Sequence, residues 1–284
     1  MEVGNLKKTF NLKKTSEFSL NVRKKILEMS FNAGSASAHI GGALSSSDII
    51  SVIFSDFLKY DKNKTTWEER DRFILSKGHA CLAYYAALNQ IGVLSDNDLM
   101  SFEKDNSDLA GHPVKNLNKG IEFSTGSLGM GLSIAVGLGI AYKKKKINNK
   151  IFVIMGDGEC NEGSNWEALM TASHFKLDNI VIFVDKNNFQ QTGNCGEILN
   201  LNNLSEKLNS FNCFSREING HDHNEIFKAI DNNLNLNGPN VIVANTIKGK
   251  GISFFENKNE WHHSVLTKKS YEEALESLNK NYEN

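Results

Sequence analysis

The chain has 284 residues, of which 40% are hydrophobic and 23% are charged, and its formal net charge is -1. This composition supports a sizeable core and excludes global disorder, while the lack of a basic excess argues against a protein that binds nucleic acid or a membrane surface. The four cysteines are scattered without a CxxC pair, so we expect reduced thiols in a cytoplasmic protein and neither a disulfide framework nor a zinc site.

No Pro-rich or Ser-rich linker divides the chain, which contains only two prolines. We therefore predict a flexible N-terminal segment over residues 1–15 and a single domain over residues 16–284, with fraying near 275–284. The polar, Lys-rich start predicts no signal peptide. The uncharged stretch 123–142 has the length of a membrane span, but its many glycines and serines favour a helix packed closely against another backbone.

In chain order, two Ser-x-x-Asp patterns, beginning at Ser45 and Ser95, predict helix starts. Short apolar runs predict buried parallel strands, and a longer stretch predicts a helix. The strands are expected at 72–76, 151–155, 179–185 and 240–247, and the helix at 163–176. Strands that alternate with helices indicate the α/β class, as a three-layer α/β/α domain with a mostly parallel, doubly wound sheet.

Ligands in such folds bind beyond the carboxyl ends of the strands, which makes the loops there the candidate site. Glycines in these loops let the backbone approach a phosphate, and Asp157 and Asn187 supply the oxygen ligands that Mg²⁺ or Ca²⁺ prefers. The spacer 159–186 has 28 residues, enough for one helix and one strand. We therefore expect Asp157 and Asn187 to end adjacent strands and to form a metal–diphosphate site.

The pattern Gly156-Asp157-Gly158, 28 residues, Asn187-Asn188 resembles the thiamine diphosphate fingerprint, and the sequence around it resembles the transketolase branch of that family. The resemblance covers roughly residues 16–280. It also rests on the segments SAHIGGALSSSDI, LSKGHA, GHP, STGSLGMGLSIAVG and TIKGKGISFFENKNEWH. It implies a thiamine diphosphate-binding fold of the diphosphate (PP) type, with thiamine diphosphate and Mg²⁺ (or Ca²⁺) as cofactors.

The resemblance also implies roles for individual residues. The metal would be held by Asp157, Asn187 and the backbone carbonyl of Phe189. The cofactor would contact Lys77, His79, Gly126, Leu128, Gly156, Asp157, Gly158, Asn187, Lys248 and His262. Catalysis would use His39, His79, His112, His262 and Glu162. Imidazole suits this reaction, because ketol transfer moves protons between hydroxyl and carbonyl oxygens near neutral pH.

Two features leave alternatives open. The family usually reads Trp-His-Gly where this chain has Trp261-His262-His263, so we expect a narrowed site or an altered loop, and the side-chain register of His262 stays open. Glu162 and Glu167 follow the Gly-Asp-Gly turn. They are either acids that favour the start of a helix or, by the resemblance, part of a polar network between subunits.

A second chain is expected to complete the active site. In the family, the glutamate that activates the cofactor lies in a second domain, which has no room before the sequence ends at Asn284. The resemblance therefore implies the N-terminal subunit of a split transketolase, in an α₂β₂ assembly with a C-terminal, pyrimidine-binding subunit. It would transfer a two-carbon ketol unit from a ketose donor, expected to be phosphorylated, to an aldose acceptor.

Three other functions compete with this one. The thiamine-binding α-subunit of a 2-oxo acid dehydrogenase also carries a Gly-Asp-Gly…Asn motif, but the histidine set and the KGKGISF…WH segment favour transketolase. A non-catalytic thiamine diphosphate-binding subunit would keep the fold without the chemistry. A general Mg–nucleotide binder lacks support, because no Walker-type lysine follows the glycines.

Overall fold

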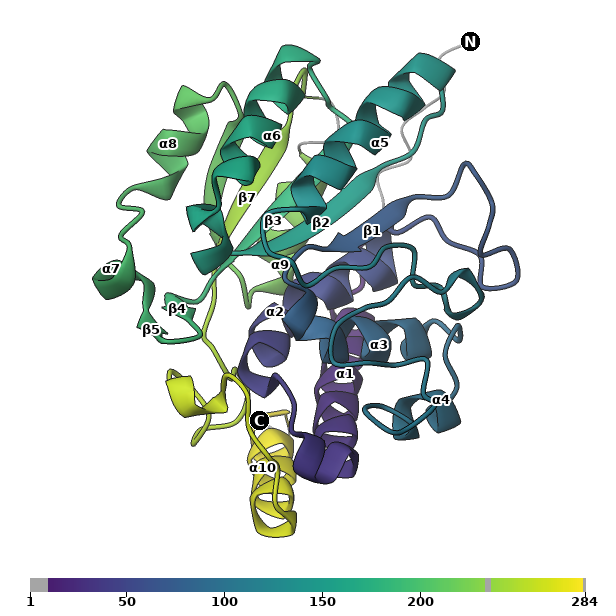
Figure 1. Ribbon diagram of the computed structural model, residues 1–284, viewed down its shortest axis with the longest axis vertical. Helices are drawn as coiled ribbons and strands as arrows, with labels where there is room; N and C mark the ends of the chain where they lie inside the picture. Colours follow the sequence, from purple (N-terminus) through teal and green to yellow (C-terminus); the bar gives the residue numbers. More distant parts are fainter. Residues whose placement is uncertain (1–9, 233–235, 283–284) are drawn as a thin grey trace.

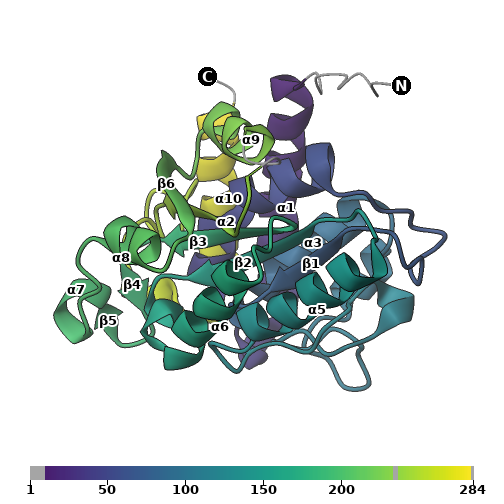
Figure 2. The same cartoon turned by 90° about the horizontal axis from the view of Figure 1, so that it is seen from above.

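The computed structural model describes residues 10–232 and 236–282. At its centre lies a five-stranded parallel sheet with the order β1-β2-β3-β7-β6, between helices on both faces (Figures 1 and 2). The strands are β1 (Arg72–Leu75), β2 (Ile151–Gly156), β3 (Ile180–Lys186), β6 (Phe214–Asn219) and β7 (Asn240–Asn245). The predicted three-layer α/β/α class is confirmed.

Each face of the sheet has its own apolar core, because side chains alternate along the strands. On β2, Phe152 and Ile154 belong to one cluster, and Val153 and Met155 to the other. The first cluster is covered by α1 (Leu12–Ala33), α2 (Ile40–Val52), α3 (Cys81–Gln90), α9 (His223–Asp231) and α10 (Lys268–Tyr282). The second is covered by α5 (Gly131–Lys145), α6 (Gly163–His174) and α8 (Leu204–Ser210).

The four predicted strands are confirmed as β1, β2, β3 and β7, while β6 was not predicted. Strands buried on both faces read as continuous apolar runs, which makes them easy to recognise. β6 pairs with β7 at the edge of the sheet, and its sequence FSREIN has residues that are exposed or half-buried. Its polar composition therefore gave no strand signal.

One of the two predicted helix starts is confirmed. Ser95 caps the short helix α4 (Asp96–Met100) in a capping box with Asp98. The start predicted at Ser45 is wrong, because α2 begins at Ile40 and Ser45 lies inside it. Ser45 and the rest of α2 are buried, and the Ser45 hydroxyl donates to Asp185 on β3 instead of capping the helix.

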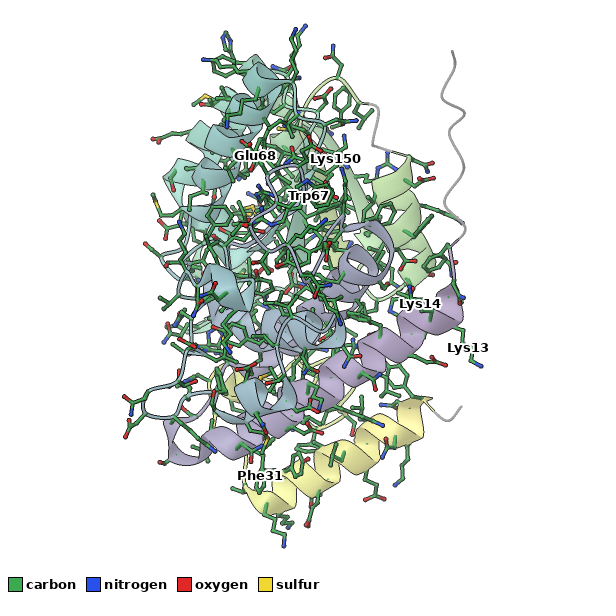
Figure 3. The ribbon with its side chains drawn as sticks, turned by 90° about the vertical axis from the view of Figure 1, so that its right-hand side faces the viewer. Lys13, Lys14, Phe31, Trp67, Glu68 and Lys150 are labelled. Carbon is green, nitrogen blue, oxygen red and sulfur yellow. The ribbon has the colours of Figure 1, made fainter. Side chains whose placement is uncertain are left out.

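The folded chain begins earlier than the predicted boundary at residue 16. α1 starts at Leu12, and the Asn11 side chain caps it by accepting a hydrogen bond from the Lys14 N–H at 3.1 Å. The remainder of the predicted flexible segment, residues 1–9, lies outside the described residues. At the other end, α10 continues to Tyr282 beside α1, where Phe31 stacks on Tyr271 with ring centroids 4.6 Å apart (Figures 1 and 3).

The uncharged stretch 123–142 contributes the first part of α5, which packs as predicted. A Cβ added to Gly131 would lie 2.8 Å from the Cα of Ser76, so the helix meets another backbone there. Within the described residues, one helical window, Ile40–Phe57, is long and apolar enough to cross a membrane. Since 89% of that window is buried inside the protein, its length and apolar composition are also those of a helix packed in the core.

Candidate functional site

The ends of β2 and β3 bring Asp157 and Asn187 to the same edge of the sheet, as predicted. The two strands are parallel neighbours, and each side chain follows the end of its strand. Asp157 accepts hydrogen bonds from the backbone N–H groups of Gly158 at 2.8 Å and Asn188 at 2.6 Å. The Asp157 carboxylate therefore ties together the two loops that follow these strands.

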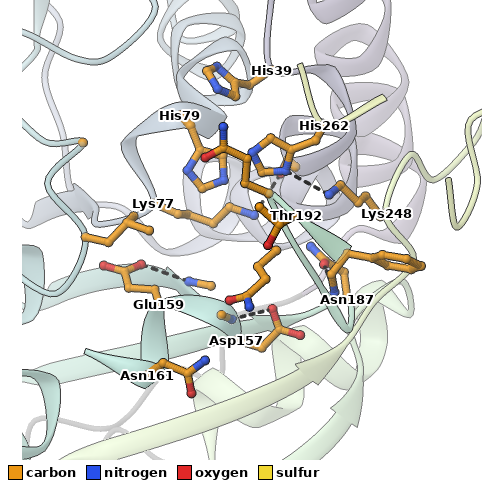
Figure 4. Close-up of a pocket in the computed structure, with 18 of the residues that line it drawn as sticks. His39, Lys77, His79, Asp157, Glu159, Asn161, Asn187, Thr192, Lys248 and His262 are labelled. Carbon is orange, nitrogen blue, oxygen red and sulfur yellow. Dashed lines mark hydrogen bonds between the residues drawn. The ribbon is translucent and has the colours of Figure 1, made fainter. Parts of the chain in front are cut away.

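A cavity of about 430 Å³ opens beside these loops (Figure 4). The structure brings all the residues predicted for the site into its lining, although they come from distant parts of the sequence. These residues are His39, Lys77, His79, His112, Gly126, Leu128, Gly156, Asp157, Gly158, Glu162, Asn187, Phe189, Lys248 and His262. The hairpin of β4 (Phe189–Gln190) and β5 (Gly193–Asn194) adds Gln190, Gln191 and Thr192.

Close contacts explain the glycines in and beside the lining. A Cβ on Gly78, next to the lining residues Lys77 and His79, would lie 2.6 Å from the backbone nitrogen of Gly126, and one on Gly158 would lie 2.8 Å from the Cβ of Gln190. Gly126 itself has a φ of +137°, a backbone conformation that residues other than glycine rarely adopt. The cavity is therefore bordered by bare backbone that an anion can approach.

The charges of the cavity suit a metal-bound anion. Burial and the neighbouring Asp185 carboxylate raise the pKa of Asp157 to about 6, which a divalent cation would reverse. Lys248 donates hydrogen bonds to Asn259 Oδ1 and His262 Nδ1, both at 2.9 Å, and burial and Lys77 lower its pKa to about 8. Both of these partners are neutral, so the Lys248 ammonium is available to an anion.

The donor set also limits the kind of metal. Among the described residues, no group of three or more His, Cys, Asp or Glu side chains could hold an ion. Asp157, the Asn187 carboxamide and the Phe189 carbonyl offer oxygen only, which suits Mg²⁺ completed by phosphate and water oxygens. All four cysteines are free and buried, in agreement with the expected reduced thiols.

Lys77 lines the cavity but also has a buried acidic partner. Its ammonium donates to the Asp185 carboxylate, which is 0% exposed, and to the Gly42 carbonyl at 3.1 Å. Sequence analysis did not place Asp185 in the site. Its signal was a carboxylate in the last buried position of an apolar strand.

Glu159 is the second residue that sequence analysis missed. Its buried carboxylate accepts hydrogen bonds from the Ser76 hydroxyl and from the backbone N–H groups of Gly129 and Gly156. It thereby joins the ends of β1 and β2 to the glycine-rich loop before α5. The predicted Glu162 also lines the cavity, but it is exposed, as is Glu167 on α6.

Four histidines gather at the other end of the cavity, and Figure 4 shows three of them, His39, His79 and His262. The ring centroid of His39 lies 5.5 Å from those of His79 and His112 and 5.4 Å from that of His262. Burial and neighbouring positive charge lower the pKa of His39 to about 4 and that of His262 to about 3. Because Lys248 donates to Nδ1 of His262, its Nε2 carries the hydrogen.

His263 lies outside this lining and contacts it through His39, with ring centroids 4.3 Å apart. Its Nε2 is 3.0 Å from the Ser37 hydroxyl. Next to these side chains, Ala38 and Ser264 exchange two backbone hydrogen bonds of 3.1 and 3.0 Å. We call the segments 37–39 and 262–264 the clasp. The extra histidine therefore does not displace His262 from the cavity.

Ser37 carries the backbone strain of the clasp. Its φ of 60° with ψ of 176° lies in a region that is essentially restricted to glycine. Such a conformation costs about 1–3 kcal/mol and persists only where the surroundings impose it. The surroundings are the hydrogen bond of Ser37 to His263 and the backbone pairing of the next residue, Ala38, with Ser264.

Comparison with known proteins places this site in a family. A model of the family "Transketolase, thiamine diphosphate binding domain" matches residues 20–283. An apulose-4-phosphate transketolase subunit of Actinobacillus succinogenes is 41% identical over 258 residues, which cover 90% of this chain and 93% of that protein. A 6-deoxy-6-sulfo-D-fructose transketolase subunit of a Clostridium species is 38% identical over 85% of this chain and 88% of its own length.

Solved structures show the same fold. The transketolase of Campylobacter jejuni superposes with a TM-score of 0.89 at 32% identity over 95% of this chain. The chain spans 43% of the length of that transketolase.

Proposed function

Because this chain belongs to the transketolase family through its thiamine diphosphate-binding domain, we propose that it works as the diphosphate-binding subunit of a two-chain, Mg²⁺-dependent transketolase. The enzyme transfers a two-carbon ketol unit from a ketose, expected to be phosphorylated, to an aldose. One observation carries the proposal. Asp157 and Asn187 end adjacent strands and share a glycine-bordered cavity with Lys248 and four histidines.

The residues present fit the cofactor. Asp157, Asn187 and the Phe189 carbonyl would hold Mg²⁺, and Lys248 would bind the diphosphate. Once bound, thiamine diphosphate supplies the electron sink for carbanion chemistry. Anchoring and charge compensation are therefore the tasks of this end of the cavity.

The histidines handle protons at the other end. At neutral pH, the lowered pKa values keep His39 and His262 uncharged, so each ring offers one N–H donor and one acceptor nitrogen. His262 presents its donor from Nε2, because its Nδ1 is occupied by Lys248. The N–H of a neutral ring donates a hydrogen bond to a carbonyl or hydroxyl oxygen, and the bare nitrogen of His39 can take a proton from a hydroxyl.

A partner chain is the second part of the proposal. Two relatives of matching length are named as subunits of transketolases, which supports a chain that acts with another. We assign the partner the pyrimidine-binding role, in an α₂β₂ assembly in the cytoplasm. The exposed Glu162 and Glu167 would join a polar network at the interface between subunits. The two relatives are named for different sugars, so the proposal extends to the ketose class only.

Reconstitution tests the proposal. The purified chain, its pyrimidine-binding partner and the pair are each supplied with thiamine diphosphate and Mg²⁺, and two-carbon transfer between a ketose and an aldose is followed by product analysis. We expect turnover by the pair, negligible turnover by either chain alone, and loss of turnover in the pair that carries Asp157→Ala. Turnover by the isolated chain contradicts the two-chain model. Reaction with pyruvate in place of a ketose indicates the 2-oxo acid dehydrogenase alternative.

A further inference from the structure

Asp185 collects polar side chains from separate elements although it does not line the cavity. Its Oδ2 accepts hydrogen bonds from the Ser45 hydroxyl at 2.6 Å and from the Lys77 ammonium, while its Oδ1 accepts one from the Thr246 hydroxyl. The Asn187 amide nitrogen lies 3.5 Å from Oδ2. One carboxylate thus connects α2, the loop after β1, the end of β3 and the end of β7.

Asp185 is ionised in this environment. Its carboxylate forms a buried ion pair with the Lys77 ammonium, and the Ser45 and Thr246 hydroxyls lie at hydrogen-bond distance from its two oxygens. A carboxylate of this kind only accepts hydrogen bonds. The direction of each hydrogen bond around Asp185 follows from this.

The acceptor role of Asp185 also fixes which groups donate and which accept at Ser45 and Asn187. Ser45 Oγ has one hydrogen, and its two acceptor neighbours, Asp185 Oδ2 at 2.6 Å and the Gly42 carbonyl at 3.1 Å, both require it. A lone pair therefore remains for Asn187, whose Nδ2 donates to Ser45 Oγ at 3.3 Å. The carbonyl end of Asn187 must then face the other way, where its Oδ1 accepts the Phe189 N–H at 3.0 Å.

We propose that Asp185 is a positioning residue that, directly and through Ser45, fixes which end of the Asn187 carboxamide is turned away from it, and thereby sets the affinity of the site for a divalent metal. The inference rests on the proposed function, in which Asn187 is a metal ligand. If the Asn187 carboxamide rotated by half a turn, so that Oδ1 and Nδ2 exchanged places, it would offer N–H groups to the cation in place of an oxygen. Asp185 thus determines whether Asn187 acts as a ligand.

Metal affinity in the reconstituted pair of chains tests this inference. Binding of Mn²⁺ is measured by electron paramagnetic resonance in the presence of saturating thiamine diphosphate, without any assay of turnover. Asp185→Asn gives residue 185 its own N–H donors and frees Ser45 to reverse its hydrogen bond. We expect Mn²⁺ binding to weaken by about 10–100-fold, as is usual when a residue that orients a metal ligand is lost.

Ser45→Ala and Thr246→Val separate positioning from general stability. Ser45→Ala removes the hydroxyl between Asp185 and Asn187 but leaves the 3.5 Å hydrogen bond from Asn187 Nδ2 to Asp185 Oδ2. It should therefore weaken Mn²⁺ binding less than Asp185→Asn does, and it keeps the test available should Asp185→Asn not fold. Thr246→Val removes a hydrogen bond to the other oxygen of Asp185, so it should lower the melting temperature and leave Mn²⁺ binding unchanged. The double variant of Ser45 and Asp185 should lose no more affinity than Asp185→Asn alone, because Ser45 acts on Asn187 only together with Asp185.

Three results would overturn the inference. They are wild-type affinity in a folded Asp185→Asn, an equal loss of affinity in Thr246→Val, and additive losses in the double variant. A wild-type pair that binds neither Mn²⁺ nor thiamine diphosphate would overturn the proposed function as well. The two failures are therefore distinguishable.

Discussion

At the scale of single residues, His39 depends on neighbours that lie far from it in the sequence. His263 covers its ring from outside the cavity, and Ser37, two residues away, hydrogen-bonds to His263. An aromatic contact of this kind contributes about 0.5–1.5 kcal/mol. His263 therefore supports the position of His39 without touching the metal end of the site.

Replacement of this residue tests that support. In the reconstituted enzyme, His263→Gly should lower kcat by about two- to tenfold, since His39 loses a contact of about 0.5–1.5 kcal/mol. The affinity for thiamine diphosphate, measured by calorimetry, should stay unchanged, because His263 does not line the cavity. His174→Gly, at an exposed residue of α6, is the matched control. A large loss of cofactor affinity in His263→Gly would show that the clasp supports the whole site.

At the scale of elements, the glycines divide into those that allow close contact and those that do not. Gly78 lies in the turn after β1, where an added Cβ would be 2.6 Å from the backbone of Thr125 and Gly126. Gly137 lies within α5, where an added Cβ would meet nothing within 4 Å. The same substitution should therefore have opposite effects at the two positions.

Urea unfolding of the two alanine variants measures this contrast. Gly78→Ala should reduce the free energy of unfolding by about 1–3 kcal/mol, because backbone must move to admit the methyl group. Gly137→Ala should increase it by about 0.5–1 kcal/mol, because alanine favours the helix. Equal changes in the free energy of unfolding of the two variants would contradict the close contact between the loop after β1 and the loop before α5.

At the scale of the whole molecule, the histidine cluster makes stability depend on pH. Burial lowers the pKa values of His39 to about 4 and of His262 to about 3, from an ordinary value of 6.5, and lowers that of His79 well below 6.5. At a pH between the ordinary pKa of 6.5 and the lowered values, these histidines bind protons in the unfolded chain but not in the folded chain. By linkage, these groups favour folding fully above pH 6.5, and their contribution is lost as the pH falls toward 4.

The melting temperature as a function of pH reports this contribution. We expect the melting temperature to fall as the pH is lowered from 7 to 5. The fall should be less steep in His39→Gln, because the glutamine side chain does not titrate. The exposed His174, replaced in the same way, serves as the control and should leave the slope unchanged. A wild-type slope in His39→Gln would mean that the His39 ring is not protected from protonation in the folded protein.

Sequence patterns predicted the parts of the site that local structure produces. The apolar runs of β2 and β3, with a spacer of the right length, placed Asp157 beside Asn187 because parallel neighbours end at the same edge. Asp185 was missed because its partners are remote, with Ser45 140 residues and Thr246 61 residues away. The same contact explains the wrong helix start at Ser45, whose hydroxyl turns to Asp185 and not to a helix end.

The clasp has a consequence for how the two ends of the cavity respond to disturbance. Asp157 and Asn187 follow neighbouring strands of the sheet, whereas His39 and His262 lie on loops that are joined to each other by the Ala38–Ser264 pairing. The unfavourable dihedral angles of Ser37 would relax if that pairing opened. Anything that pulls one loop aside therefore withdraws both imidazoles together, while the ion-binding end keeps its shape. The protein would then still hold its coenzyme but would lack two of the four imidazoles that handle protons.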